Sequence, residues 1–167
     1  GGLQHIKLAG YDILVIKGQS DRPVYLHINN DHVEICDAQH LWGKDTFETP
    51  DILWGELGHH YQIAAIGPAG ENLVRHAAVI GDQYVSWGRT GLGAVMGSKN
   101  LKAIAVYGDV GVSVANLPKI MKLSKECAHG MLADTKSLNI WRDGGTWKNQ
   151  MLGTYHDKLD LPRAMSE

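Results

Sequence analysis

Cysteine is scarce in this chain of 167 residues, which contains only Cys36 and Cys127, far apart in the sequence. Neither belongs to a CxxC pair, so the usual ligand patterns for zinc and for iron–sulfur clusters are missing from the sequence. Two isolated thiols are typical of free, buried cysteines in a reducing compartment. We therefore expect a cytoplasmic protein with two free thiols; a single disulfide is the alternative.

Long apolar runs and an excess of positive charge are also lacking. No run approaches the roughly 18 apolar residues that a membrane-spanning helix needs. The chain begins Gly-Gly-Leu-Gln-His, without the basic start and apolar core of a signal peptide. The formal net charge is −2 and the pI is about 6.5, whereas a general nucleic-acid binder is expected to be basic. We predict neither a membrane nor a nucleic acid as partner.

Apolar patterning predicts an α+β protein whose first part is rich in strands. Residues 24–28 and 33–36 alternate apolar and polar around Asn-Asn-Asp, which predicts a hairpin. Thr49 as the cap and Pro50 at the first position predict a helix that ends at Gly58. Further strands are expected at residues 13–16, 63–66, 73–80 and 101–107.

The pattern becomes helical after about residue 113, because apolar residues recur at three- and four-residue spacing from Leu117 onward. We therefore predict a β-rich domain over residues 1–113 and the beginning of a helical domain over residues 114–167. The chain lacks an initiator methionine and its tail stops without an evident end. We expect a fragment that lacks the N-terminal part of the first domain and most of the second. Short helices are also expected at residues 135–141 and 147–156.

Residues 88–100 read GRTGLGAVMGSKN, with four glycines, one arginine, one lysine and no acidic residue. Glycine lets backbone N–H groups approach a ligand closely, and a helix that begins after such a loop adds unpaired donors. Arg89 can bind a phosphate with two hydrogen bonds, and Lys99 and Lys102 add positive charge. The stretch predicts an anion site for a phosphate. A tight glycine turn that packs closely and binds nothing is the alternative.

Two common phosphate motifs fit this stretch poorly. A P-loop requires GxxxxGK followed by Ser or Thr, and here Ser98 precedes Lys99. A dinucleotide fingerprint requires GxGxxG between an apolar strand and a helix, with an acid about 20 residues further on. Asp109 stands at a suitable distance, but the spacing is GxGxxxG and residues 82–90 are not an apolar strand. A dinucleotide-binding module and a structural domain without a phosphate ligand remain the alternatives from other classes.

Residues 88–104 closely resemble the signature of the tungsten-dependent aldehyde:ferredoxin oxidoreductase family. Three more blocks resemble the same family: GPAGENLVR at residues 67–75, LWGKDT at residues 41–46, and KLAGYD at residues 7–12. The blocks stand in the family's order and cover roughly residues 1–110. The resemblance implies an N-terminal domain built as a saddle of β-sheets, followed by helical domains.

The resemblance also implies a cofactor site in the glycine-rich stretch. Members of the family bind tungsten through the dithiolenes of two pterins, and a magnesium ion bridges the pterin phosphates. A guanidinium suits a phosphate, and a backbone carbonyl, here that of Thr90, is a suitable hard ligand for Mg²⁺. The implied cofactor residues are Arg89, Thr90, Gly91, Leu92 and Gly93, together with Gly2 as the end of an Asn-x-Gly-Gly stretch whose asparagine is absent here.

The resemblance implies that the full-length enzyme oxidises aldehydes to carboxylic acids, with ferredoxin or another electron-transfer subunit as acceptor. A sister branch carries the tungsten site of a benzoyl-CoA-reducing complex, and these residues do not separate an aldehyde from an aromatic substrate. The family's CxxCxxxC motif for a 4Fe–4S cluster is missing from this sequence. We expect the cluster, and the catalytic residues, in domains outside this chain, so that the chain alone is inactive. Homo-oligomerisation stays open.

Histidines, one glutamate and one tryptophan invite further hypotheses. Nine histidines suggest a metal, but no pair has HExxH spacing, so we expect surface or hydrogen-bonded histidines. Glu71 is a candidate base, although a cap or an ion pair with Arg75 is the simpler interpretation. Trp87, just before the glycines, is a candidate wall of the cofactor site, although packing is the simpler interpretation.

Overall fold

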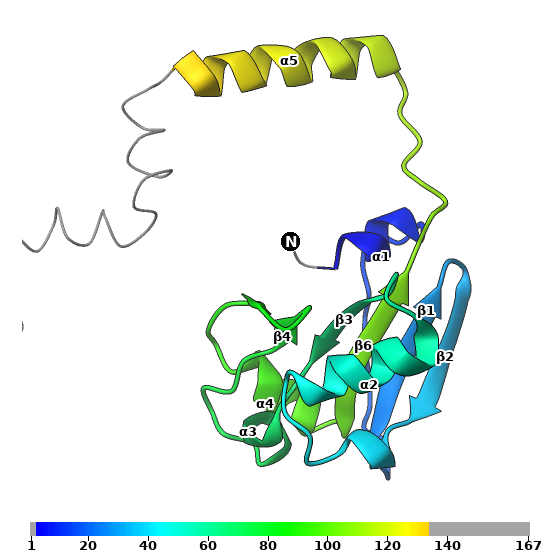
Figure 1. Ribbon diagram of the computed structural model, residues 1–167, viewed down its shortest axis with the longest axis vertical. Coiled ribbons are helices and arrows are strands. Elements are labelled where there is room, and N and C mark those ends of the chain that lie inside the picture. Colours follow the sequence, from blue (N-terminus) through cyan, green and yellow to red (C-terminus); the bar gives the residue numbers. More distant parts are fainter. Residues whose placement is uncertain (1–2, 134–167) are drawn as a thin grey trace, which may run out of the picture. The chain divides into compact units, whose positions relative to one another are not determined.

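The computed structural model describes residues 3–133, which fall into two compact units that divide between Ser113 and Val114. The first unit contains a six-stranded sheet with short helices (Figure 1), which confirms the predicted α+β class. Whether the units are domains of a longer protein stays a prediction. The strands are β1 Val24–Asn29, β2 His32–Asp37, β3 Gln62–Ala65, β4 Ile80–Gly81, β5 Val85–Ser86 and β6 Leu101–Tyr107, and the helices of this unit are α1 Gln4–Leu8, η1 Gln39–Leu41, α2 Glu48–Leu57, α3 Pro68–Glu71 and α4 Leu92–Gly97.

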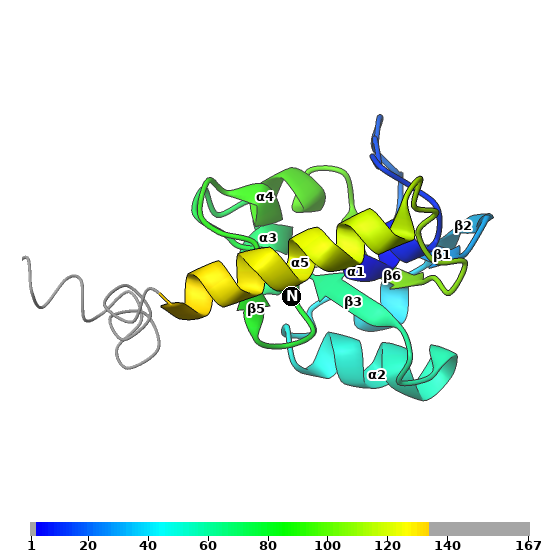
Figure 2. The same cartoon turned by 90° about the horizontal axis from the view of Figure 1, so that it is seen from above.

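The sheet is built around β6. The strand order is β2-β1-β6-β3-β4-β5, and β6 pairs in parallel with β1 and antiparallel with β3. Its sequence LKAIAVY is buried along almost its whole length, as expected for a strand covered on both faces. Helix α4 lies on one side of the sheet and α2 on the other (Figure 2). A first hydrophobic core lies on the face with α1 and α4, and a second lies under α2. The predicted strand at residues 101–107 is therefore confirmed.

The predicted hairpin is confirmed as β1 and β2. Asn29 pairs with His32, so Asn30 and Asp31 form a two-residue loop. Asn30 has a φ of 54°, a left-handed conformation that asparagine tolerates better than most residues. β2 is the edge strand, and most of its residues are exposed.

Helix α2 is confirmed, but the predicted cap is wrong. The side-chain Oδ1 of Asp45 accepts hydrogen bonds from the backbone N–H groups of Phe47 and Glu48, both at 2.7 Å. The Glu48 side chain accepts one in return from the N–H of Asp45 at 3.1 Å. This exchange is a capping box. Thr49, the predicted cap, is instead fully buried.

The capping box makes stability depend on pH. The amides of Glu48 and Phe47 hold the pKa of Asp45 below its ordinary value, so its carboxylate stabilises the fold above the unfolded pKa of about 3.9 and loses this effect as pH falls through the lower, folded pKa. We expect Asp45→Asn, which keeps an acceptor but does not titrate, to have a flatter stability profile below about pH 4. Urea denaturation from pH 2 to 6 would measure it; identical profiles would contradict the assignment.

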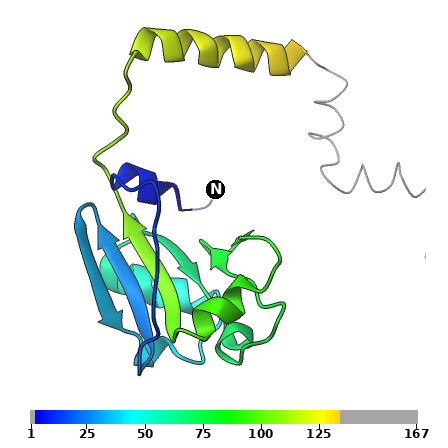
Figure 3. The same ribbon diagram turned by 180° about the vertical axis from the view of Figure 1, so that it is seen from behind.

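Residues 13–16, predicted as a strand, pair with no strand in the described part of the chain. They are extended and cross the first face of the sheet (Figure 3). Leu14 and Ile16 pack on the first core, whereas Ile13 and Val15 are exposed. The alternation that suggested a strand therefore reflects one-sided packing without backbone pairing.

Residues 73–80 are likewise not a strand, apart from Ile80 at the start of β4. Leu73 has a φ of 57°, and the N–H of Ala77 closes a turn on the carbonyl of Val74 at 2.9 Å. The Ala77 carbonyl then accepts the N–H of Gly93 at 2.9 Å. This apolar run thus contacts the start of helix α4, and only Ile80 joins the sheet.

The second unit is described as far as residue 133 and contains helix α5, Leu117–Ala133. The predicted helical pattern from Leu117 is confirmed there. The expected helices at residues 135–141 and 147–156 lie outside the described residues, as does Gly2. No helix within residues 3–133 has the length and apolar content needed to cross a bilayer.

Candidate functional site

The glycine-rich stretch forms an exposed loop that runs into α4. Arg89 and Thr90 are exposed, and Gly91 precedes the helix in the left-handed conformation. Thr90 has a φ of 97°, which is a genuine outlier for a β-branched residue and costs about 1–3 kcal/mol. Strain of this kind gathers at functional sites, so it favours a ligand-binding loop over a plain turn.

The loop presents unpaired backbone groups. Within residues 3–133, the N–H groups of residues 89–92 donate no hydrogen bond, and the carbonyl of Thr90 accepts none. The N–H of Gly93, by contrast, is held by Ala77. Four free donors beside a guanidinium suit an anion, and a free carbonyl suits a hard cation. Of the predicted cofactor residues, Arg89 to Leu92 therefore have polar groups that are available to a ligand, whereas the backbone of Gly93 is used in packing.

Close packing accounts for three of the four glycines. A Cβ on Gly91 would lie 2.2 Å from the carbonyl oxygen of Arg75, and one on Gly93 would lie 2.7 Å from that of Ala78. A Cβ on Gly97 would lie 2.0 Å from the carbonyl oxygen of Gly70, in α3. Each of these atoms is backbone and cannot turn aside. The packing interpretation of the glycines is thus correct for α4, and it also fixes where the loop stands.

Lys102 does not contribute charge to this loop, contrary to the prediction. Its side chain is fully buried, and Nζ donates to Glu71 Oε1 at 2.5 Å and to the carbonyl oxygen of Lys44 at 2.7 Å. Burial lowers the pKa of Lys102, while the adjacent Glu71 carboxylate opposes the shift. The pair is an internal link between β6 and α3.

Glu71 is part of the same link and not a base. Besides the ion pair, its carboxylate accepts the N–H of Gly43 at 3.0 Å. The expected partner Arg75 is replaced by Lys102. This link therefore joins three of the four blocks that resemble the family. Gly43 and Lys44 belong to the block at residues 41–46, Glu71 to that at 67–75, and Lys102 to that at 88–104. Because α3 packs on α4, this link supports the candidate loop from behind.

An apolar groove of about 480 Å³ begins beside the loop, on the first face of the sheet. Trp87 and Leu92 line it, together with Met96 and Lys99. The Trp87 indole nitrogen is buried and donates no hydrogen bond in the part of the chain that the structure describes. Lys99 directs its Nζ to the carbonyl of Gly18 at 2.9 Å. Trp87 thus lines the groove next to the loop, and its part as a wall of the cofactor site stays a prediction. Lys99 lies beyond the C-terminal end of α4.

The topology does not provide a dinucleotide site. A Rossmann loop joins a strand to a helix within a parallel βαβ unit. Here the strand before the loop is β5, a two-residue edge strand that pairs antiparallel with β4, and the strand after α4 is β6, several positions away in the sheet. The dinucleotide alternative therefore loses its structural basis.

Comparison with known proteins settles the family. The family described as aldehyde ferredoxin oxidoreductase, N-terminal domain, matches residues 2–108. The chain belongs to this family. The resemblance noted in the sequence is thereby confirmed.

Curated relatives of the family are much longer than this chain. The tungsten-containing aldehyde ferredoxin oxidoreductase of Thermococcus kodakarensis is 52% identical over 122 residues, which are 72% of this chain and 20% of the relative. The tungsten-containing aldehyde ferredoxin oxidoreductase of Pyrococcus furiosus is 50% identical over 122 residues, again 72% of this chain and 20% of the relative. The chain thus spans about a fifth of the length of these relatives.

A solved structure of the family has the same fold. It is the active-site complex BamBC of benzoyl-coenzyme A reductase with 1,5-dienoyl-CoA, with a TM-score of 0.70 and 46% sequence identity. The match covers 73% of this chain and 19% of that one. An aliphatic sulfonate oxidoreductase, WOR-like subunit, of Pyrococcus furiosus is 40% identical over 62% of this chain and 19% of its own length.

Proposed function

We propose that this chain is part of a tungsten bis-pterin oxidoreductase that oxidises aldehydes to carboxylic acids with ferredoxin as acceptor. Family membership supports the class of enzyme. The observation that carries the site is the loop of residues 89–92, with an exposed guanidinium. Its four N–H groups and the Thr90 carbonyl have no hydrogen-bond partner among the residues that the structure describes. In this proposal the loop holds the phosphate and magnesium end of the cofactor.

Each residue of the loop has a distinct part. Arg89 pairs with a pterin phosphate, because a guanidinium matches two phosphate oxygens at once. The free amides of residues 90–92 add donors to the same anion, and the Thr90 carbonyl is offered to Mg²⁺. Gly91 and Gly93 let the loop lie directly on the backbone of residues 75–78. Trp87 and Leu92 exclude water on the side of the groove.

The redox chemistry belongs to the metal and its pterins, which supply two-electron exchange with a carbonyl substrate when bound. This chain's part is to bind and orient that group. A 4Fe–4S cluster, its ligands and the catalytic residues are proposed to lie in other parts of the full-length enzyme, and the electrons to leave to ferredoxin or another electron-transfer subunit. Cytoplasmic location goes with this proposal.

Arg89→Ala is expected to weaken cofactor binding on the order of 10- to 100-fold, the worth of a charge-assisted hydrogen bond to phosphate. The full-length enzyme, purified without oxygen, would be measured for tungsten and for organic phosphate per chain. Both should fall together in the variant. Arg22→Ala is the matched control, because Arg22 is an exposed arginine that lies near Asp37, at 3.7 Å.

Two results would overturn the proposal. A wild-type enzyme with a bound nucleotide and neither tungsten nor molybdenum would contradict the cofactor. Full tungsten occupancy in Arg89→Ala, with the phosphate content unchanged, would remove Arg89 from the site.

A second candidate function is reduction of an aromatic acyl-CoA. The solved relative, 46% identical, is a complex of benzoyl-coenzyme A reductase. The two functions differ in substrate and direction, so the full-length enzyme would be assayed for dye reduction with an aldehyde and for dye oxidation with benzoyl-CoA. Activity in the first assay alone supports the aldehyde proposal.

A further inference from the structure

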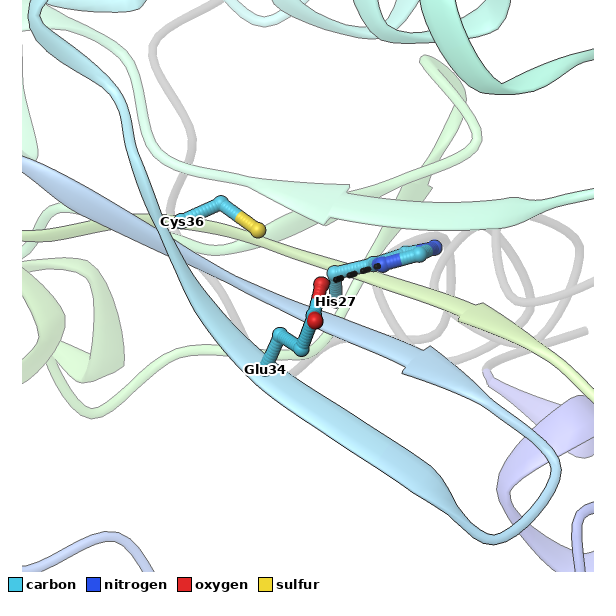
Figure 4. Close-up of side chains that lie close together, drawn as sticks. All are labelled: His27, Glu34 and Cys36. Atoms are coloured by element: carbon cyan, nitrogen blue, oxygen red, sulfur yellow. Dashed lines mark ion pairs between the residues drawn. The ribbon is translucent and has the colours of Figure 1, made fainter.

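A cluster of metal-binding side chains lies on the β1–β2 hairpin. His27 stands directly opposite Glu34, and Cys36 is the next residue of β2 on the same face. One ligand atom from each of the three lies within 4.8 Å of the others. Figure 4 shows the thiol, the carboxylate and the imidazole converging on one space, with His27 Nδ1 and Glu34 Oε2 at 3.8 Å.

We propose that His27, Glu34 and Cys36 form a binding site for a divalent ion of zinc type. Imidazole nitrogen, thiolate and carboxylate are the three ligand classes that zinc takes in proteins, at about 2.0–2.3 Å. Tetrahedral coordination at those lengths places ligand atoms about 3.3–3.8 Å apart. For nitrogen and oxygen the separation is about 3.3–3.5 Å, so the 3.8 Å between His27 and Glu34 must shorten by a few tenths of an ångström. The thiol, within 4.8 Å of both, must approach by roughly an ångström.

Neighbouring groups contact two of the ligands and orient them. His27 Nε2 lies 3.0 Å from the Tyr61 hydroxyl, so donation from Nε2–H to that oxygen leaves the Nδ1 lone pair for the ion. His32 Nε2 lies 2.8 Å from Glu34 Oε1 and orients the carboxylate. Partners of this kind are the outer shell that metal sites use to fix their ligands.

Tyr25, next to Cys36, does not compete as a ligand. Tyr25 is buried and belongs to the second hydrophobic core. Glu34 is half exposed, and water can complete the coordination.

The role that follows is to hold the edge of the sheet. Among the described strands, β2 pairs with β1 alone, and an ion bound by one residue of β1 and two of β2 ties the strands together. Binding releases the Cys36 thiol proton, because the thiolate is the ligand. This inference does not depend on the proposed cofactor site, which lies on other elements.

The test is cobalt and zinc binding to the 167-residue chain, stripped of metal by a chelator and kept reduced with a phosphine. Co²⁺ is expected to give a thiolate-to-cobalt charge-transfer band that Cys36→Ser abolishes. Zinc, measured by competition with a chromophoric chelator, is expected to bind about 10-fold or more weakly to His27→Gln and Glu34→Gln. Zinc should raise Tm more in the wild type than in Glu34→Gln at the same zinc concentration.

Cys127→Ser and His129→Gln are matched controls on α5 and should bind as the wild type does. Metal-free melting curves show whether each variant folds, and His27→Gln leaves the thiol in place if Cys36→Ser does not fold. A cobalt spectrum without a thiolate band, or equal zinc affinity in the wild type and the ligand variants, would overturn the site. A band that disappears with Cys127→Ser would do so too.

Discussion

Lys102→Met is expected to destabilise the first unit by about 3–5 kcal/mol, the usual effect of removing one partner from a buried ion pair. The Lys102 side chain is fully buried and that of Glu71 is 6% exposed. Without the ammonium, the Glu71 carboxylate keeps only the N–H of Gly43 and must stay charged in a poor solvent or take up a proton. Chemical denaturation at pH 7 would measure the loss.

Two further variants separate the ion pair from the volume of the side chain. Lys44→Met is the matched control: Lys44 lies 3.4 Å from Glu48 in an exposed i,i+4 pair, so we expect a change below about 0.5 kcal/mol. The double variant Lys102→Met with Glu71→Gln should recover part of the stability, because no charge is then left unpaired. Additive losses in the double variant would show that the two side chains are not coupled.

The elements that could be predicted from sequence are those whose signal is local. The apolar run of β6, the alternation of the hairpin around Asn30 and the spacing that begins at Leu117 all lie within one element. The cap of α2 was also readable, because Asp45 and Glu48 have capping-box spacing. Thr49 and Pro50 also have the pattern of a helix start, one turn after Asp45. The Thr49 side chain is buried instead and does not cap the helix.

The contacts that could not be predicted join distant parts of the chain. Glu71 and Lys102 are 31 positions apart, and nothing in the sequence near Lys102 distinguishes a buried ammonium from one that binds phosphate. The apolar residues 73–80 resemble a strand, yet the Ala77 carbonyl accepts the N–H of Gly93 in α4. The cluster of His27, Glu34 and Cys36 requires the register of the hairpin, which brings His27 opposite Glu34. A search for histidine pairs on a helix face overlooks a site of this kind.

The glycines of the candidate loop predicted an anion site, but ligand binding explains only part of their presence. Its glycines suggested bare backbone for an anion, and residues 89–92 do present free donors. Three of the four glycines, however, are required by the contact of α4 with α3 and with residues 75–78. Of these four glycines, only Gly88 combines a positive φ with open space around it. Packing therefore positions the loop, and the residues between the glycines supply its chemistry.

Gly97→Ala is the sharpest test of that packing, and we expect it to destabilise the fold by about 3 kcal/mol, the upper part of the range for overpacked sites. Gly97 has no positive φ, so the substitution adds no backbone strain. Its Cβ would lie 2.0 Å from the carbonyl oxygen and 2.7 Å from the carbonyl carbon of Gly70. Neither side can yield easily, because Glu71 anchors α3 to the buried Lys102.

The matched control is Gly55→Ala in α2, where the added methyl group meets nothing within 4 Å. Alanine is the better helix former, so this variant should gain about 0.5–1 kcal/mol. Denaturation of the two variants should therefore show changes of opposite sign. In the full-length enzyme, Gly97→Ala should also lower the tungsten content, because a shifted α4 carries the free donors of residues 89–92 with it. A neutral Gly97→Ala variant would mean that α3 and α4 are not held in contact, and the loop would then have no fixed support for a cofactor.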